Sequence, residues 1–532
     1  MKSSDILSFK IPLFVLLVIL IFSCDSSTKP ISSNVINIHD EITIDEIRKA
    51  YELNEYTIKE LTQFYLDRIE SLSFDGPELN AVITINPDAL DIAAQLDDEM
   101  QNGIIRGPLH GIPVLLKDNI DTGDKMPCTA GSRAMKESYP PEDSPVAAQL
   151  RMAGAVILGK ANLSEWANFH SNYSSSGWSG LGGQTKNPYD LSRNPCGSSS
   201  GSAVSVAANL CVLAIGTETN GSIVCPANNN GIVGIKPTVG LISRRGIIPI
   251  SLSQDTGGPF ARTIKDAAIC LGTLTAVDSL DSKTLAPGRI AYKDYTQFLN
   301  SDGIRGKKLG YWKTPLSDHV RMTNVMEEAI EFFRSNGATI IELDQIIDRK
   351  AMDNSFNVLL YEFKDGLNNY FRNLGSAAQV KDLEDLIDKT FADSIEMKYH
   401  DHELFKIAQS KGDLDSEDYR KSLEIMVQLS REEGIDKLME EYELDAIIAP
   451  TGGPAWKTDL VNGDNFGVHS SSPAAIAGYP SIVVPMGQID GLPVGLSIFG
   501  RPWSEPVLLE IAYSYEQGTK KRFTPKYIKG DL

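Results

Sequence analysis

The sequence predicts an α/β fold, a mixed β-sheet flanked by helices, with a helical layer over one side. Short, continuous apolar runs such as GIPVLLKDNI and AVILGKAN are typical of strands buried on both faces of a sheet. Segments with apolar residues at helical spacing, such as VAAQLRMAG, alternate with these runs. Residues 300–440 differ, because they are rich in charged amphipathic helices. This alternation of buried strands and helices is the basis of the predicted fold class.

The first 40 residues differ in composition from the rest of the chain. Residues 1–23 combine a lysine-containing start with the apolar run IPLFVLLVILIF, which is too short for an ordinary membrane span and fits a secretory signal. The segment Ile21-Phe22-Ser23-Cys24 resembles a bacterial lipoprotein cleavage site, at which Cys24 is lipidated. Residues 24–40 are polar and predict a tether. We therefore expect an exported, lipid-anchored protein of the bacterial cell envelope, with a plain signal or an uncleaved anchor as the alternative.

The elements after residue 40 follow in a clear order. Residues 41–71 predict two or three helices before Gly76. AVSVAANLCVLAIGTET predicts a helix of small residues and then a strand. Residues 300–440 predict a helical layer, after which LDAIIAP, YPSIVVPMG and LPVGLSIFG return to short strands. With no internal repeat, one domain over residues 41–525 is the simplest organisation.

The charge balance narrows the classes of partner. The chain has 532 residues, with 50 basic and 70 acidic side chains, and a formal net charge of −20. This charge repels phosphate backbones and leaves no basic patch for nucleic acid or anionic lipid. We therefore expect no nucleic-acid partner, no obligate protein partner, and membrane contact only through the N-terminal lipid.

Cysteine and histidine give no metal-binding pattern. Without Cys24 an odd number of cysteines remains: Cys128, Cys196, Cys211, Cys225 and Cys270. We expect these to be small buried residues rather than a disulfide framework. The seven histidines are scattered, with His400 and His402 as the close pair, and the sequence contains no C-x-x-C or H-E-x-x-H motif. The sequence therefore predicts no metal site.

Three segments carry candidate reactive groups. CGSSSGS, which starts at Cys196, places four serines beside two glycines before a predicted helix, and its plainest interpretation is a flexible loop with an N-cap. GTETNGSIVCPA contains Ser222 in a predicted tight turn, whose N–H groups suit a developing oxyanion. Lys117 ends a predicted buried strand. If its amine is buried, its pKa falls and it becomes available as a base; otherwise it reaches solvent.

A rival arrangement uses Ser199 as the nucleophile. The segment from Gly197 to Gly201 matches the G-x-S-x-G elbow of α/β-hydrolases, with His469 and either Asp445 or Asp464 as downstream partners. Such an elbow follows a strongly apolar strand. The preceding KNPYDLSRNPC contains two prolines, which argues against a central strand and disfavours this arrangement.

Taken together, LLKDN, CGSSSGSAVSVAA and GTETNGSIVCPANNNGIVGIKPTVG resemble the amidase signature family. The resemblance implies that family's Ser–cis-Ser–Lys triad. Lys117 falls on the family's lysine, Ser198 on its cis-serine and Ser222 on its nucleophile. The two serines are 24 residues apart, as is usual in the family.

The resemblance also implies an oxyanion hole made of backbone N–H groups from Thr219, Asn220, Gly221 and Ser222. Ser199 is expected to have a supporting role. Asn220 stands where the family has glycine, which is tolerable if its backbone is left-handed. Glu218 replaces an aspartate and Val224 an arginine, a coherent pair of changes if those two side chains normally interact.

The activity implied by the resemblance is amide hydrolysis without metal or other cofactor. GSIVCPA, RGIIPISLSQDTGGP, LLYEFKDGLNNY and PAWKTDLVNGDNFG look most like the peptide amidase branch, which hydrolyses the C-terminal carboxamide of peptide amides. The alternatives are a general amidase acting on small or fatty amides, the aminoacyl-tRNA amidotransferase branch, which export and the acidic charge disfavour, and a non-catalytic binding lipoprotein. We expect the substrate pocket near residues 300–440 and 451–467, with Tyr361, Glu362 and Trp456 as candidate lining residues.

Overall fold

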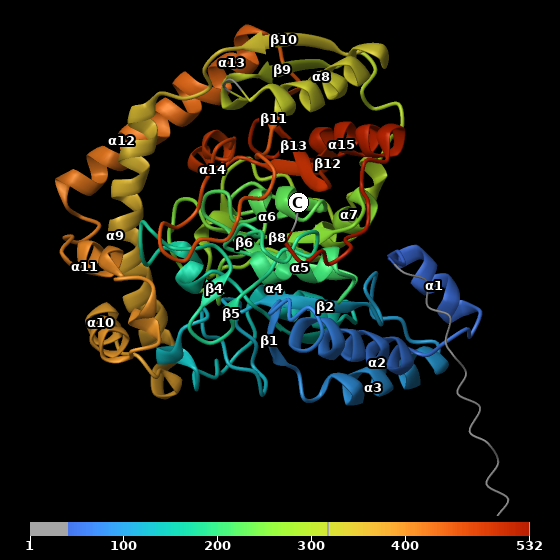
Figure 1. The fold of residues 1–532 in the computed structure, drawn as a ribbon, viewed down its shortest axis with the longest axis vertical. Coiled ribbons are helices and arrows are strands. Elements are labelled where there is room, and N and C mark those ends of the chain that lie inside the picture. The colour runs from blue at the N-terminus through green and yellow to red at the C-terminus, as the bar shows by residue number, and fades with distance from the viewer. Residues whose placement is uncertain (1–40, 317–318, 531–532) are drawn as a thin grey trace, which may run out of the picture. The chain divides into compact units, whose positions relative to one another are not determined.

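The computed structural model describes residues 41–316 and 319–530, which form a single large α/β domain (Figure 1). The predicted signal at residues 1–23 and tether at residues 24–40, with Cys24, lie outside the described residues. Among the residues that are described, no helix is both long and apolar enough to cross a membrane.

A mixed sheet forms the centre of the domain. Within the described residues it has eleven strands, in the order β1 (Val82–Ile85), β3 (Val156–Ala161), β2 (Pro113–Lys117), β6 (Leu213–Glu218), β8 (Thr256–Ala261), β7 (Val233–Lys236), β12 (Ser481–Ile489), β13 (Leu492–Phe499), β11 (Ala446–Pro450), β9 (Lys308–Trp312) and β10 (Thr339–Leu343). Its neighbouring strands pair parallel from β3 through β2 to β6 and from β11 through β9 to β10, and antiparallel elsewhere. Strands β4 (Trp178–Ser179) and β5 (Gly183–Gln184) pair separately. The predicted fold class is confirmed.

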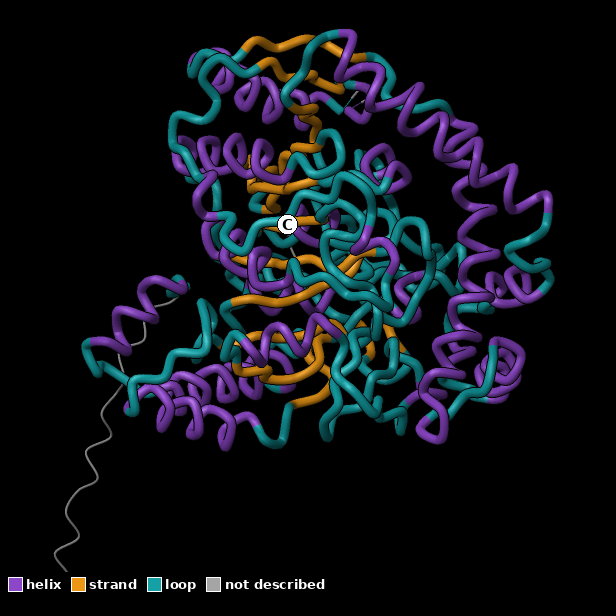
Figure 2. The backbone as a smooth tube through the Cα atoms, turned by 180° about the vertical axis from the view of Figure 1, so that it is seen from behind, coloured by secondary structure: helices purple, strands orange, loops and turns teal. Residues whose placement is uncertain are grey.

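Helices flank this sheet on both faces, as the view from behind also shows (Figure 2). They are α1 (Ile44–Glu52), α2 (Ile58–Ile69), α3 (Ala89–Gln101), α4 (Pro145–Met152), α5 (Ser200–Ala207), α6 (Val224–Asn229), α7 (Ile264–Leu274), α8 (Val320–Ser335), α9 (Arg349–Leu374), α10 (Leu383–Ala392), α11 (Glu403–Gln409), α12 (Glu417–Ser430), α13 (Asp436–Glu441), α14 (Ser472–Ala477) and α15 (Glu505–Thr519).

The first two helices begin where their sequences predict. Thr43 starts α1 and Thr57 starts α2, each through a reciprocal pair of hydrogen bonds with the glutamate three residues later. Such capping boxes satisfy N–H groups that a helix start otherwise leaves without partners. The prediction of two or three helices before Gly76 is confirmed.

The apolar runs form the expected strands. Every residue of β2 and of β3 is buried, as their unbroken apolar sequences predict for strands covered on both faces. LDAIIAP, YPSIVVPMG and LPVGLSIFG form β11, β12 and β13, the other predicted strands. Strand β2 ends at Lys117, so the backbone delivers this side chain at the strand's carboxyl end.

Residues 300–440 are largely helical, as their sequence predicts, but they also contain two strands that were not predicted. Strands β9 and β10 extend the sheet at one end, beside α8 (Figure 1). The helices α9, α10 and α11 form the predicted layer. Their apolar side chains share a core cluster with Trp166 and Phe169, so this layer packs against the segment that follows β3.

Candidate active site

Lys117 lies wholly inside the protein. Its Nζ donates to Ser198 Oγ at 2.7 Å and to Thr217 Oγ1 at 2.8 Å, and the residue is 0% exposed. Burial lowers the pKa of Lys117 to about 7, while the negative charges of Asp255 and Glu218 oppose the shift. A buried ammonium loses its hydration, so a large fraction of this amine is neutral at neutral pH. The alternative in which Lys117 reaches solvent is wrong.

Ser198 lies in the loop before α5, and the peptide bond between Gly197 and Ser198 is cis, as the resemblance implies. Its hydroxyl is buried beside the Lys117 amine. Its carbonyl accepts a hydrogen bond from the N–H of Ser164 at 3.0 Å. The structure therefore brings the predicted lysine and cis-serine into direct contact.

Ser222 lies in the turn between β6 and α6, at the wall of a cavity of about 340 Å³. Its carbonyl accepts the N–H of Ser199 at 3.2 Å, which places the two serine loops side by side. The hydrogen bonds of the described residues do not include one between the Ser198 and Ser222 hydroxyls. Catalytic hydrogen bonds are often long before substrate binds, so Ser222 is next to the pair formed by Lys117 and Ser198 but is not bonded to it.

The predicted oxyanion turn lines the same cavity. It comprises Thr219, Asn220, Gly221 and Ser222, whose backbone N–H groups donate to no acceptor among the described residues. The left-handed residue of the turn is Gly221, with φ of +88°. Asn220 itself is not left-handed, so asparagine needs no special tolerance at this position; its side chain accepts the Ser471 hydroxyl at 2.8 Å.

Ser199 joins the serine loop to the sheet. Its Oγ donates to the carbonyl of Thr217 at 3.0 Å and accepts the N–H of the same residue at 3.1 Å. Both bonds hold the loop against the end of β6, next to the Lys117 amine. These contacts fit the predicted supporting role for Ser199 and occupy the hydroxyl that the elbow arrangement requires as its nucleophile.

The elbow arrangement has no geometric support. No strand leads into the serine loop, because residues 186–196 form loop structure. The two acids it requires are engaged elsewhere, since Asp445 accepts the N–H of Lys308 and Asp464 that of Ser176. His469 lines the cavity, but no hydrogen bond links it to either aspartate among the described residues.

The candidate lining residues are placed differently from the prediction. Glu362 is buried and accepts the hydroxyls of Ser251, Ser253 and Tyr419. Tyr361 donates to Asp418, and Trp456 donates to Asp464 at 3.3 Å. None of these three residues is among those that line the cavity at Ser222. The cavity is instead lined by their neighbours Leu359 and Phe466, together with Ala167, Asn168, Phe169, Ile250 and Thr451.

A family model described as Amidase matches residues 60–509. The chain belongs to the amidase family.

Three relatives of this amidase span most of its length. A probable amidase of Arabidopsis thaliana is 43% identical, covering 97% of each chain. A putative amidase of Schizosaccharomyces pombe is 36% identical, covering 92% of this chain and 87% of its own. The solved structure of a native peptide amidase from Stenotrophomonas maltophilia is 48% identical, with a TM-score of 0.88. The match covers 92% of this chain and 99% of the peptide amidase chain.

A disulfide links the two serine loops of this amidase. Cys196 and Cys225 are bonded, so the expectation that all five cysteines are unpaired is wrong. The pair is 29 residues apart, and linear spacing did not reveal that the loop before Ser198 and the helix after Ser222 meet. Cys128, Cys211 and Cys270 are free and buried, as predicted.

The contacts of Glu218 show how valine can stand at position 224, where the family has arginine. Its Oε2 accepts the N–H groups of Ile223 at 2.7 Å and Val224 at 3.0 Å, where α6 begins. A carboxylate at a helix N-terminus is stabilised by these N–H groups and by the helix dipole. In this amidase the backbone thus satisfies an oxygen of the acid, and Val224 takes no part in an ion pair.

Sequence reasoning missed three polar residues around the amine. Thr217 Oγ1 accepts hydrogen bonds from Lys117 and, at 3.0 Å, from Asn119 Nδ2. Asp255 accepts the hydroxyl of Thr219 and faces Lys117 as a negative charge. Thr217 belongs to the motif GTET and Asn119 to the motif LLKDN, each within two residues of a predicted site residue. This proximity in sequence was the signal that could have identified them.

His469 provides a test that separates the two serine schemes. We expect His469→Ala to retain most amide-hydrolysing activity, because His469 lines the cavity but has no hydrogen bond to Lys117, Ser198 or Ser222 among those of the described residues. The elbow scheme instead requires a loss as large as that of removing the nucleophile. The measurement is kcat/KM for ammonia release, and a loss of several orders of magnitude in folded His469→Ala would favour the elbow.

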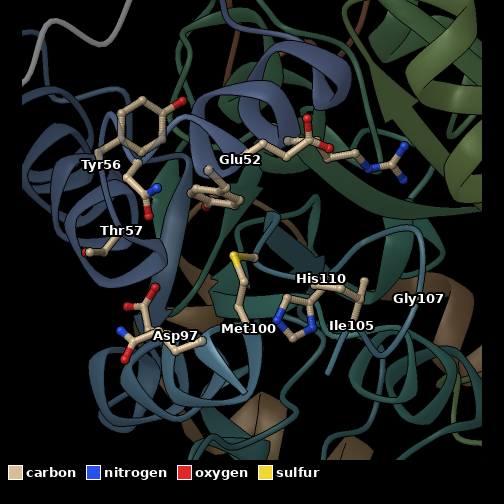
Figure 3. Close-up of a pocket in the computed structure, with 12 residues that line it drawn as sticks. Glu52, Tyr56, Thr57, Asp97, Met100, Ile105, Gly107 and His110 are labelled. Atoms are coloured by element: carbon tan, nitrogen blue, oxygen red, sulfur yellow. The ribbon is translucent and has the colours of Figure 1, made fainter. Parts of the chain in front are cut away.

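A second cavity, of about 430 Å³, is lined by α1, the turn before α2, α3 and the segment that follows α3 (Figure 3). Two of its titratable side chains make structural contacts. Asp97 accepts the N–H groups of Ile58 and Lys59 at the start of α2. His110 Nε2 lies 3.1 Å from the carbonyl of Leu96. None of the predicted site residues lines this cavity. We therefore assign the amidase site to the cavity at Ser222.

Proposed function

We propose that this amidase hydrolyses a carboxamide C–N bond through Lys117, Ser198 and Ser222 and an acyl-enzyme. The observation that carries the proposal is the fully buried Lys117 amine, 2.7 Å from the hydroxyl of Ser198. Amide hydrolysis needs an activated nucleophile, a stabilised oxyanion and a proton for the departing nitrogen. The residues around the cavity supply all three.

The neutral Lys117 amine accepts the proton of Ser198, which accepts that of Ser222 as Ser222 Oγ attacks the carbonyl carbon. The backbone N–H groups of the oxyanion turn, residues 219–222, donate to the oxyanion that forms. As the tetrahedral intermediate collapses, the C–N bond breaks and the proton returns along the same path to the departing ammonia. Water then attacks the acyl-enzyme, the same groups accept its proton, and the acid is released.

We further propose that the substrate is the C-terminal carboxamide of a peptide amide. Two observations support this: the 48% identity to a peptide amidase over most of both chains, and an apolar wall beside Ser222. Phe169, Ile250, Leu359 and Phe466 form that wall, which suits an apolar side chain next to the scissile amide.

A panel of peptide amides, free amino acid amides and fatty amides, with ammonia release as the readout, tests the substrate class. We expect the highest kcat/KM for peptide amides with an apolar C-terminal residue. Turnover of only small or fatty amides would instead make this chain a general amidase. Because the net charge of −20 disfavours nucleic acid, we expect activity in its absence. We also expect activity without an additional protein partner.

We propose that the protein is exported and held at the cell envelope by a lipid on Cys24. The support is the signal-like composition of residues 1–23, and the Cys196–Cys225 disulfide, since disulfides persist in oxidising compartments. Mass spectrometry of the mature N-terminus from bacterial membranes tests this. A diacylated Cys24 is expected, and an unmodified or intact N-terminus would contradict the anchor.

A further inference from the structure

A group of buried histidine and glutamate side chains lies outside the catalytic centre. Glu165 and His170 come from the segment that follows β3, while Glu396, His400 and His402 come from the segment between α10 and α11. All five are at most 4% exposed. The two segments are more than 200 residues apart in sequence, and the helical layer brings them together.

The histidines of this group have buried polar atoms without hydrogen-bond partners. The atoms are His170 Nδ1, His402 Nδ1 and both ring nitrogens of His400. Burying a polar group without a partner costs free energy, and native proteins rarely leave such atoms unsatisfied. Several of them in one place indicate that the group binds something.

Two buried acids of this group are direct neighbours. Glu165 accepts the N–H of Gly180, the Glu396 carboxylate lies against the same glycine, and the two carboxyl groups hydrogen-bond to each other. Glu396 also accepts the Ser132 hydroxyl and the N–H of Arg133. Within the described parts of the chain, no ion pair joins either acid to a lysine or arginine. Two adjacent buried carboxylates of this kind favour a bound cation over an empty site.

The free ligand atoms face one another. One ligand atom each from Glu165, His170 and His402 lies within 4.8 Å of the others. The His170 ring centroid is 4.7 Å from that of His402 and 5.1 Å from that of His400. Ligands around tetrahedral zinc at about 2.1 Å are about 3.4 Å apart, so shifts of about 1 Å complete the site.

The outer contacts orient two of these ligands. His402 Nε2–H donates to the carbonyl of Glu396 at 3.1 Å, which leaves Nδ1 as the ligand atom. Glu165 Oε2 accepts the N–H of Gly180 at 2.6 Å, so Oε1, on the side of Glu396, is the oxygen that a cation would bind in place of the proton shared with that acid. Metal-binding histidines characteristically donate their second ring nitrogen to a carbonyl or carboxylate in this way.

We propose that Glu165, His170 and His402 bind a structural zinc ion, with His400 as the fourth ligand. Nitrogen and oxygen donors of this kind suit zinc, and a closed set of four protein ligands is typical of structural sites. The prediction of no metal site rested on linear spacing, which did not reveal a site made of two distant segments.

The position of this site gives the ion a role. Ala167, Asn168 and Phe169, which lie between Glu165 and His170, line the cavity at Ser222. An ion that joins this short segment to the 396–402 segment fixes one wall of the substrate cavity against the helical layer. It takes no part in the proton transfers of the proposed function, and the inference does not depend on them.

Metal analysis of the untagged full chain, followed by chelation and titration with Zn²⁺ or Co²⁺, tests the proposal. We expect one tightly bound ion per chain, a rise in Tm on Zn²⁺ addition, and the intense visible absorption of tetrahedral Co²⁺. His402→Gln and Glu165→Gln should each weaken binding about tenfold or more. His319→Asn is the matched control, because His319 caps α8 away from this group and asparagine also caps helices; its metal binding should equal that of the wild type.

Three results would overturn the proposal: the absence of tight binding by the wild-type chain, a Co²⁺ spectrum with thiolate charge-transfer bands, or unchanged affinity in both ligand variants. The wild-type spectrum decides the case even if a variant fails to fold. Labelling of Ser222 by a fluorophosphonate in the metal-free chain provides a separate readout, so loss of zinc and loss of the catalytic site are distinguishable.

Discussion

Replacing Ser222 with alanine should abolish amide hydrolysis, lowering kcat by about 10⁶-fold. The reason is that Ser222 is the one hydroxyl of the proposed triad that lines the cavity, while Ser198 is wholly buried. Ammonia release from a peptide amide, at equal concentrations of folded wild type and Ser222→Ala, measures the effect.

Ser205→Ala is the matched control for this experiment. Ser205 is a buried serine of α5 whose hydroxyl has no hydrogen-bond partner among the described residues. Removing such a hydroxyl leaves no partner unsatisfied, so its activity and Tm should stay close to those of the wild type. Near-normal turnover by Ser222→Ala would mean that another residue is the nucleophile.

Removing the Lys117 amine should lower kcat by about 10²–10⁴-fold, the usual contribution of a general base. Because the pKa of Lys117 is lowered to about 7, the neutral, proton-accepting form grows as the pH rises through 7. The rate of the wild-type enzyme should therefore increase with pH across this region. The measurements are kcat/KM against pH for the wild type, Lys117→Ala and Lys117→Met.

The two lysine variants separate chemistry from packing. Lys117→Ala opens a cavity at the end of β2, whereas Lys117→Met keeps most of the side-chain volume without the amine. We expect both to lose activity equally and Lys117→Met to retain the higher Tm. A fully active Lys117→Met would contradict the relay, as would a wild-type rate that does not change between acidic and mildly alkaline pH.

Most of the sheet was predictable because burial determines the sequence of its strands. The strands β2, β3, β12 and β13 are almost entirely buried and therefore read as continuous apolar runs. Strands β9 and β10 lie at one end of the sheet, and residues 339–342 of β10 are exposed or half-buried. Their sequences lack the continuous apolar run that indicates a buried strand. Because amphipathic helices flank them in sequence, the whole region was predicted as helical.

The catalytic centre was predictable for a different reason. Lys117, Ser198 and Ser222 stand in motifs that resemble a family, so their proximity did not have to be derived from packing. Contacts between distant segments had no such signal. The Cys196–Cys225 disulfide and the His170–His402 pair both depend on how the chain folds, and linear spacing does not report that.

In the proposed mechanism, an uncharged, buried amine activates Ser222 through Ser198. The deciding experiment measures the rate at which a fluorophosphonate labels the protein on either side of about pH 7 and maps the adduct by mass spectrometry. We expect a single adduct on Ser222 that forms faster as the pH rises, and a slow, pH-independent reaction in Lys117→Met. Labelling of Ser199, or equally fast labelling in folded Lys117→Met, would refute this mechanism.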